Sequence, residues 1–367
     1  MAKNKPYMSQ NLAYLLSEFY NASKKSICFI TKNDSESKLL LNELKYFLKP
    51  EEVLWFPESE ILPYDHFSIP NKITKKRFAI LNKENDSKNI IITSVKNLFE
   101  RFPSIEYFKS SGSFDTNTRI SIDELTNIVI KMGYQKISNV EKINQYSVRG
   151  GIIDIYSPLY KNPLRIEIFD NNIESIRLFD VESQLSNSEV KKFSLSKGDL
   201  IPLNIDSVNL FKSKWRDYFQ DSDERYCELF QLINNNKMPE GIEVYLPFFF
   251  NGTSDLTSLL SNYKFVRSDD LDEEIRTFNN FISQRYEDEL EDIQRPLIKP
   301  NDLFFDSKNI LLFIEKVKKI DKTKSKLNIN NFNDLVNEVN KGFLNKKKVV
   351  LLFSHQNELE NYINNFT

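Results

Sequence analysis

Glycine is scarce in this chain, and its distribution limits the possible folds more than any other feature does. The 367 residues contain 8 glycines; five lie between residues 112 and 198, and none precedes Gly112. A phosphate-binding loop needs glycines, because its backbone amides must approach the phosphates and some of its residues adopt a positive φ. We therefore expect no Walker A loop in the first hundred residues, and the later glycines lack the G-x-x-x-x-G-K-[ST] spacing.

Length and charge bound the class of protein. The chain is about two to three times as long as a usual domain, so we expect several domains. Its net charge of −2 argues against a chain whose main work is to coat nucleic acid or an anionic membrane. No apolar run approaches the roughly 20 residues that span a bilayer, and the N-terminus is polar, without a secretory signal. We expect a soluble, cytoplasmic protein with no membrane partner.

Residues suited to catalysis or metal binding are few. Cys28 and Cys227 lie far apart and resemble neither a disulfide framework nor a zinc motif. Asp65 and His66 offer an acid and a base, but no nucleophile is evident. The acidic run 287–289 could pass for a helicase carboxylate motif, yet it falls inside an expected exposed helix. We predict no catalytic residue, no metal ligand and no cofactor-binding residue in this chain.

The first hundred residues indicate an α/β unit. Apolar runs at 27–30, 53–56 and 90–93 are typical of buried strands. Apolar residues at helical spacing follow the first run at 39–47 and the third at 95–102. Continuous apolar strands that alternate with helices predict a parallel sheet covered on both faces.

The pattern changes near residue 111 and becomes α+β. Ser121 and Glu124 have the spacing of a capping box at the start of a helix that ends before Gly133. A strand at 152–156 is entered through two glycines, and strands 164–169 and 173–179 are predicted to form a hairpin around Asp170-Asn171-Asn172. This stretch is predicted to be a compact insertion.

From residue 199 onward the pattern is again mainly helical. We expect a helix that carries Trp215, a buried extended stretch at 242–250 and a long acidic helix at 271–294. The last elements, a strand at 349–353 and a helix at 357–365, bury little surface. We therefore expect the chain to be a fragment or truncation of a longer one.

The hairpin carries the residues most suggestive of a binding surface. Side chains alternate along a strand, so Arg165, Glu167 and Phe169 share one face while Ile166 and Ile168 share the other. Arg165 and Phe169 are then about 13 Å apart at roughly 3.3 Å per residue. Arginine and aromatic residues are enriched in interface hot spots.

Two neighbouring arginines extend this hypothesis, and two simpler interpretations compete with it. Arg149 could join the face if its strand neighbours the hairpin, and Arg177 on the return strand is a further candidate. Alternatively, Arg165 pairs with Glu167 or Glu174, which contributes little at a surface, and Phe169 covers a small satellite core.

The sequence around this face resembles a known module. The segments at 146–156, 165–170 and 176–180 resemble the UvrB-like homology module, which the excinuclease B subunit shares with the bacterial transcription-repair coupling factor (Mfd) family. The coupling-factor family is favoured by further stretches at 56–65, 215–216 and 239–243. The missing Walker A loop also fits that family, because the excinuclease subunit needs an intact loop near its start.

The resemblance implies an α/β fold with four segments. Residues 1–110 and 199–304 would form a degenerate RecA-like parallel-sheet domain without a Walker A loop. Residues 111–198 would be an inserted α+β domain that interacts with the excinuclease A subunit (UvrA), and residues 305–367 would begin a further α/β domain.

The resemblance also implies partners and a function. In the family, the residues that contact UvrA match Arg149, Arg165 and Phe169 here, and the same surface is masked by the protein's own C-terminal domain. The expected function is to recruit UvrA to lesion-stalled RNA polymerase, coupled in the full-length protein to ATP-dependent DNA translocation and polymerase release. Stalled polymerase, duplex DNA, ATP and magnesium would be bound by domains that this sequence lacks.

Three hypotheses compete: a partner-binding module, an ATP-dependent enzyme such as an excinuclease B-like damaged-DNA-binding protein, and a DNA-binding piece. The second needs nucleotide binding, which the glycine distribution disfavours. The third could use the basic cluster Lys72, Lys75, Lys76 and Arg77, for which we favour one solvated helix face.

Overall fold

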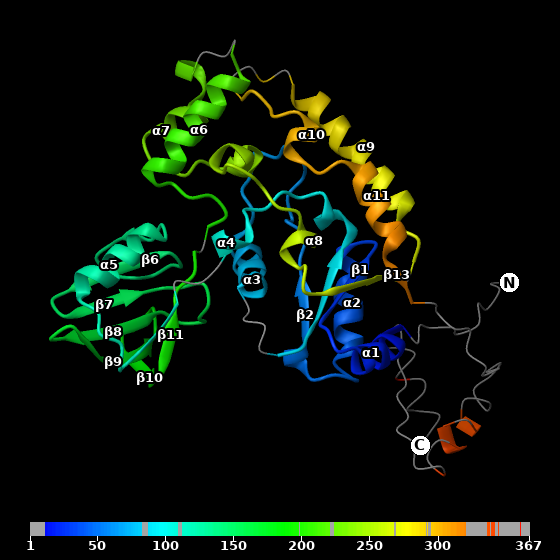
Figure 1. Ribbon diagram of the computed structural model, residues 1–367, viewed down its shortest axis with the longest axis horizontal. Helices are drawn as coiled ribbons and strands as arrows, with labels where there is room; N and C mark the ends of the chain where they lie inside the picture. Colours follow the sequence, from blue (N-terminus) through cyan, green and yellow to red (C-terminus); the bar gives the residue numbers. More distant parts are fainter. Residues whose placement is uncertain are drawn as a thin grey trace.

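The chain folds around two main sheets with separate hydrophobic cores (Figure 1). The computed structural model describes residues 12–320 except 83–86, 109–111, 198, 221–223, 268, 291, 293 and 294, together with a few positions between 336 and 360. The strand expected at 349–353 lies outside the described residues, as does almost all of the helix expected at 357–365.

The first sheet is parallel throughout, as predicted, with the strand order β13-β12-β1-β3-β2. Its strands are β1 (Ile27–Thr31), β2 (Val53–Phe56), β3 (Ile90–Ser94), β12 (Lys264–Arg267) and β13 (Lys318–Lys319). Every residue of β1 and β3 is buried, which is typical of central strands covered on both faces.

Helices cover both faces of this sheet. One face packs against α1 (Leu12–Ala22) and α2 (Asp34–Leu44). The other packs against α3 (Asn71–Leu81), α9 (Asp272–Glu289) and α11 (Ser307–Lys316). The two cores use alternate residues of the same strands, so the sheet is a fully covered central layer.

The C-terminal boundary of this unit differs from the expected one. A new domain was expected from residue 305, but α11 contacts α9 and β13 pairs with β12. Val266 lies opposite Lys318, and Arg267 lies opposite Lys319. Residues 307–319 therefore belong to the parallel-sheet unit.

The inserted unit is a second, mostly antiparallel sheet with the order β10-β9-β8-β7-β6-β5. Its strands are β5 (Gln135–Lys136), β6 (Gln145–Arg149), β7 (Ile152–Ile155), β8 (Leu164–Phe169), β9 (Asn172–Phe179) and β10 (Ser186–Glu189). Helix α5 (Ile122–Lys131) begins at the predicted Ser121–Glu124 capping box and packs on one face of the sheet. A small ribbon of β4 (Ser113–Asp115) and β11 (Lys192–Ser194) completes the unit.

Short helices complete the parallel-sheet unit. The helix predicted around Trp215 is α6 (Ile205–Tyr218), and its tryptophan is fully buried among aromatic rings. Within residues 12–320, further helices are α4 (Ile105–Phe108), α7 (Glu228–Asn234), α8 (Leu256–Leu259), α10 (Pro300–Leu303) and the 3-10 helices η1 (Pro50–Glu52), η2 (Val95–Leu98), η3 (Glu224–Tyr226) and η4 (Ile242–Phe249).

Two local predictions were wrong. The stretch 242–250 is buried but not extended: its residues form η4, which follows Gly241 in the left-handed region at φ 70°. The helix expected at 95–102 is limited to the single turn of η2. The side chain of Asn97 donates to the Phe56 carbonyl and the Thr93 hydroxyl, and Phe102 instead pairs with Ser254 as a β-bridge.

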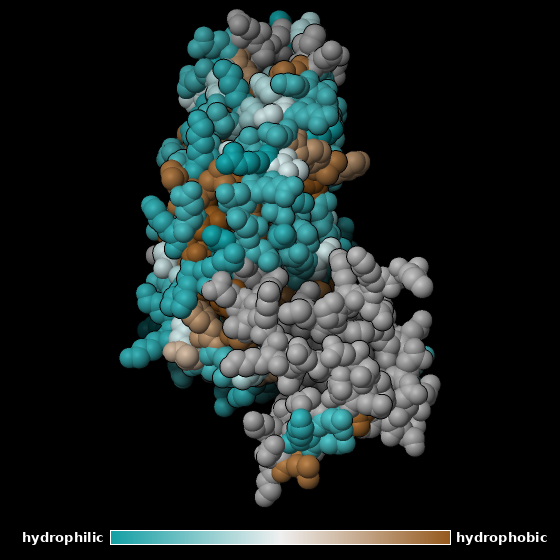
Figure 2. Space-filling model, turned by 90° about the vertical axis from the view of Figure 1, so that its right-hand side faces the viewer, coloured by the Kyte–Doolittle hydropathy of each residue, from teal (hydrophilic) through white to brown (hydrophobic). Residues whose placement is uncertain are grey.

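The surface next to α9 and α11 is mostly hydrophilic, with a narrow streak of apolar side chains, when Figure 1 is viewed from its right-hand side (Figure 2). Within the described part of the chain, no helix combines the length and the apolar character needed to cross a bilayer.

Candidate partner-binding face of the inserted sheet

The turn between β6 and β7 depends on its two glycines. Gly150 has a φ of 58°, a region that side chains rarely adopt. At Gly151, an added Cβ would lie 2.8 Å from the carbonyl oxygen of Ile168 on β8, whose amide donates to the Gly151 carbonyl at 2.8 Å. The glycines thus let the turn lie against β8, with Arg149 at the end of β6.

Strand β8 alternates as predicted. Ile166 and Ile168 are buried in the core beneath α5, whereas Arg165, Glu167 and Phe169 point to the opposite face. Phe169 is 74% exposed, so the alternative that it covers a satellite core is wrong. We call this opposite face the outer face.

A tight turn follows Phe169 and fixes its place at the end of the hairpin. Asp170 and Asn171 have φ values of 47° and 57°, which suits their short polar side chains and a two-residue hairpin turn. Phe169 pairs with Asn172 across this turn. The exposed ring is therefore carried on strand backbone that is paired with β9.

A single buried carboxylate holds both candidate arginines. Asp154 on β7 lies directly opposite Arg165 on β8, and its side chain is 1% exposed. Arg165 Nε and Nη2 donate to Asp154 Oδ1 and Oδ2 at 2.8 and 3.0 Å. Arg149 Nη2 donates to Asp154 Oδ2 at 2.6 Å. The structure thus brings Arg149 and Arg165 together, as the hypothesis of a shared face required.

Arg165 is further held by its other neighbours. Its Nη1 donates to the Gln184 carbonyl at 3.1 Å, and its guanidinium carbon lies 4.5 Å from the centre of the buried Phe179 ring. The hydrogen bonds to Asp154 raise the pKa of Arg165 above its ordinary value. The expected alternative, an ion pair of Arg165 with Glu167 or Glu174, is replaced by the pair with Asp154.

Arg177 forms a second, more exposed ion pair on the outer face. Its Nη2 lies 2.5 Å from Glu167 Oε2, and both side chains are about one third exposed. The hydroxyl of Ser175 donates to Glu167 at 2.7 Å. This hydrogen bond, more than the guanidinium, lowers the pKa of Glu167.

Sequence reasoning missed Asp154, although a signal was present. Asp154 interrupts an apolar strand, and alternation places it on the face opposite Ile153 and Ile155. An acidic residue at that position predicts a cationic partner on a neighbouring strand, but the register that selects Arg165 becomes visible only in the folded sheet.

The predicted basic cluster is not one solvated face. Lys72 is 74% exposed and pairs with Glu60, but Arg77 is buried. Arg77 donates to both carboxylate oxygens of Glu100 at 2.6 and 2.9 Å, and also to the Asn97 side chain. This part of the prediction was wrong, because Arg77 lies on the side of α3 that packs into the sheet core.

Asp65 and His66 do not form an acid–base pair. The Asp65 carboxylate accepts from the backbone amides of Leu62 and His66 at 3.3 and 2.8 Å. The His66 ring lies 3.2 Å from Glu289 on α9. Among the described residues, no group of three or more His, Cys, Asp or Glu side chains could hold a metal ion.

The N-terminus of α2, directly after β1, is where a phosphate-binding loop stands in nucleotide-binding α/β folds. Here the Asp34 amide donates to the Glu58 carboxylate at 3.1 Å, and the Glu36 amide donates to the Asn33 side chain at 3.0 Å. Lys96 pairs with the same Glu58 at 3.3 Å. The protein's own oxygen atoms thus occupy this helix end, and the acidic residues would repel a phosphate.

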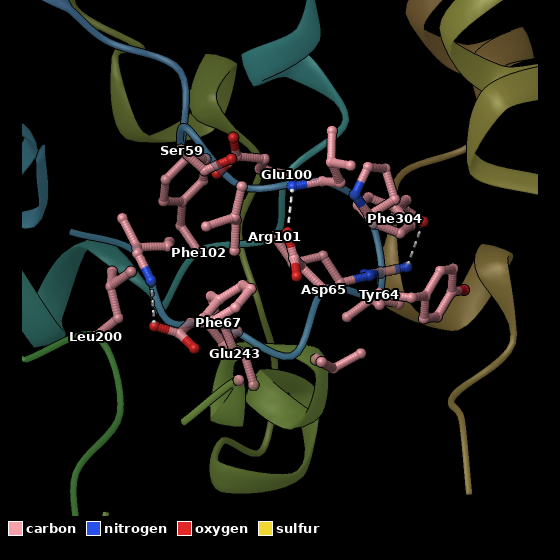
Figure 3. A pocket seen from close by; sticks show the side chains of 18 of the residues that line it. Ser59, Tyr64, Asp65, Phe67, Glu100, Arg101, Phe102, Leu200, Glu243 and Phe304 are labelled. Atoms are coloured by element: carbon pink, nitrogen blue, oxygen red, sulfur yellow. Dashed lines mark hydrogen bonds between the residues drawn. The ribbon is translucent and has the colours of Figure 1, made fainter. Parts of the chain in front are cut away.

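A cavity of about 100 Å³ lies between the loop after β2 and η4 (Figure 3). Glu243, which burial gives a raised pKa, accepts from the Ile69 amide and the Ser68 hydroxyl at 3.0 Å each. Arg101 donates to the carbonyl of Phe304 at 3.3 Å. These charged groups are held by the protein itself, so the cavity is a weaker candidate site than the outer face.

Comparison with known proteins finds relatives of the inserted unit and of most of the chain. The family model of the UvrB interaction domain matches residues 113–198, which contain Arg149, Asp154, Arg165 and Phe169. The chain is 27% identical to the transcription-repair-coupling factor of Escherichia coli over 298 residues, which cover 80% of this chain and 26% of that protein. The chain matches the N-terminal region of transcription-repair-coupling factors.

Further transcription-repair-coupling factors show the same extent of similarity. That of Haemophilus influenzae is 27% identical over 282 residues, covering 76% of this chain and 25% of the relative. That of Rickettsia bellii is 25% identical over 314 residues, covering 83% and 28%. The chain spans about a quarter of the length of the transcription-repair-coupling factors that it matches.

Proposed function

We propose that this chain is a partner-binding module of DNA repair, whose outer face binds the excinuclease A subunit, UvrA. The observation that carries the proposal is the exposed Phe169 on the same sheet face as half-exposed Arg149 and more buried Arg165, within the segment that matches the UvrB interaction domain. An exposed aromatic ring that shares a face with arginines has the composition of an interface hot spot.

Each residue has a distinct role in the proposed contact. Phe169 would fill an apolar pocket of UvrA, which removes its exposed ring from water. Arg149, whose side chain is 50% exposed, would donate to carboxylate or carbonyl acceptors of the partner. Arg165 would present its remaining N–H groups from a fixed orientation.

Similarity to the coupling factors supports a proposal about the wider role. We propose that the module recruits UvrA to lesion-stalled RNA polymerase as part of a longer protein. Polymerase binding, ATP-dependent movement on DNA and masking of the outer face by a C-terminal domain would belong to other parts of that protein.

The proposal is tested by titrating UvrA against purified variants in a calorimeter. We expect Phe169→Ala and Arg149→Ala each to weaken binding by about 2 kcal/mol or more, roughly 30-fold, with an unchanged circular dichroism spectrum. Matched controls lie in the other unit: Phe67→Ala removes a ring that is 69% exposed, and Arg216→Ala removes an exposed arginine paired with Glu224. Wild-type affinity in both outer-face variants would contradict the assignment.

The competing enzymatic function predicts nucleotide binding. We expect a fluorescent ATP analogue with magnesium to show no saturable binding to this chain, because Glu58 and Asn33 already accept from the amides at the start of α2. Saturable binding at micromolar nucleotide would support an excinuclease B-like enzyme instead.

A further inference from the structure

Asp154 is placed to control both arginines of the outer face at once. It lies on β7, between the strands that carry Arg149 and Arg165, and three hydrogen bonds of 2.6–3.0 Å converge on its carboxylate. Its side chain is 1% exposed, so a partner cannot reach it directly. An effect of Asp154 on binding must therefore act through the arginines.

We infer that Asp154 is a positioning residue of the outer face, whose single buried carboxylate sets the directions of the guanidinium groups of Arg149 and Arg165. This inference rests on the proposed function of the face as the UvrA-binding surface. In this inference Asp154 does not contact UvrA itself but orients the two arginines that do.

The single carboxylate of Asp154 can hold Arg149 and Arg165 together and still leave their cluster positively charged. Two guanidinium groups repel each other when they are brought together, and Asp154 between them removes that repulsion. Two positive charges and one negative charge leave a net positive charge of one on the cluster. Exposure increases from Asp154 to Arg165 at 16% and Arg149 at 50%, so the excess positive charge faces outward.

Asp154 also lowers the entropic cost of binding. Arg165 has five N–H groups, of which three donate to Asp154 and the Gln184 carbonyl. The Phe179 ring supports the same guanidinium at 4.5 Å. A side chain that is already held in one orientation loses little freedom when a partner binds. The partner therefore meets fixed donors that suit an acidic or carbonyl-rich surface.

The decisive variant is Asp154→Asn, which keeps the shape of the side chain and removes its charge. We expect UvrA to bind this variant at least about tenfold more weakly. In an Arg149→Ala/Arg165→Ala background the same change should have no further effect on affinity, because nothing remains for Asp154 to position. Glu167→Gln, on the same face but paired with Arg177, is the matched control and should bind within about twofold of wild type.

A second readout does not depend on UvrA. In nitrogen-15 spectra of the wild-type chain, the Arg165 Nε–H signal should exchange with water more slowly than that of exposed Arg276 on α9, and Asp154→Asn should shift it and speed its exchange. Exchange of Arg165 as fast as Arg276 in the wild type overturns the inference, even if Asp154→Asn does not fold. So does an undiminished effect of Asp154→Asn in the arginine-free background. Wild-type affinity of Arg149→Ala and Phe169→Ala would instead contradict the proposed function, and the exchange measurement would still decide the role of Asp154.

Discussion

Each unit of the protein contains a cluster of arginine and carboxylate side chains, and the two clusters differ in which partner is buried. In the parallel-sheet unit, Arg77 is 1% exposed and its partner Glu100 lies toward the surface. In the inserted unit, Asp154 is buried and its partners Arg149 and Arg165 lie toward the surface. A buried arginine, as in the first cluster, stabilises the fold. A buried carboxylate, as in the second cluster, leaves its arginines nearer the solvent.

The N-terminus of α2 and the outer face of the inserted sheet also differ in how their polar groups are used. Glu58 and Asn33 accept from the backbone amides of α2, so in the parallel-sheet unit this helix end is already occupied by the protein's own oxygen atoms. The outer face of the inserted sheet instead has an exposed Phe169 and a half-exposed Arg149. This contrast supports the proposal that the inserted sheet is the binding surface and that the parallel-sheet unit is its scaffold.

The largest expected effect follows from Arg77. Replacing it by methionine leaves Glu100 and the side-chain oxygen of Asn97 without their arginine partner, and breaking a buried pair in this way costs about 3–5 kcal/mol. We expect Arg77→Met to lower the free energy of unfolding in urea by that amount. Lys72→Met, on the exposed side of the same helix, should change it by less than about 1 kcal/mol. If Arg77→Met and Lys72→Met lowered the free energy of unfolding equally, the stabilising role assigned to buried Arg77 would be wrong.

Much of the fold could be predicted because local and periodic signals agreed. The apolar runs of β1, β2 and β3, the capping box of α5 and the turn after Phe169 each depend on a few adjacent residues. Prediction failed where distant contacts decide the backbone. The apolar stretch of η4 is compatible with a strand or a helix, and packing against α6 selects the helix.

In the candidate site, too, local patterns predicted some features and contacts between distant residues determined the others. Alternation along β8 was sufficient to place Arg165 and Phe169 on the outer face. The pairing of Arg165 with Asp154 depends on the register between β7 and β8, which no local pattern specifies. The burial of Arg77 likewise depends on how α3 rotates against the sheet, because its neighbours Lys72 and Lys76 are exposed.

A smaller effect is expected from a change in the turn that precedes β7, which should lower both stability and the affinity for UvrA. In Gly151→Ala the new Cβ would lie 2.8 Å from the Ile168 carbonyl, so the turn must move away from β8. Such overpacking costs about 1–3 kcal/mol, and the displaced turn would carry Arg149 with it. We expect a lower midpoint in urea together with weaker UvrA binding. Gly252→Ala is the control, because its Cβ would meet no atom within 4 Å; equal loss in both variants would contradict the role of the turn.

The smallest expected effect concerns the exposed pair of Glu167 and Arg177. The pKa of Glu167 is lowered in the folded chain from its ordinary value of 4.5, chiefly by the Ser175 hydroxyl. The stabilisation is therefore present above pH 4.5 and is lost as the pH falls through the lower folded value. Because the pair is about one third exposed, we expect Glu167→Gln to cost a few tenths of a kcal/mol at pH 7, and nothing once Glu167 is protonated. Urea titrations of both proteins at several pH values measure this difference. A constant difference down to pH 3 would assign the effect to packing, and a loss above about 1 kcal/mol would show that the outer face also stabilises the fold.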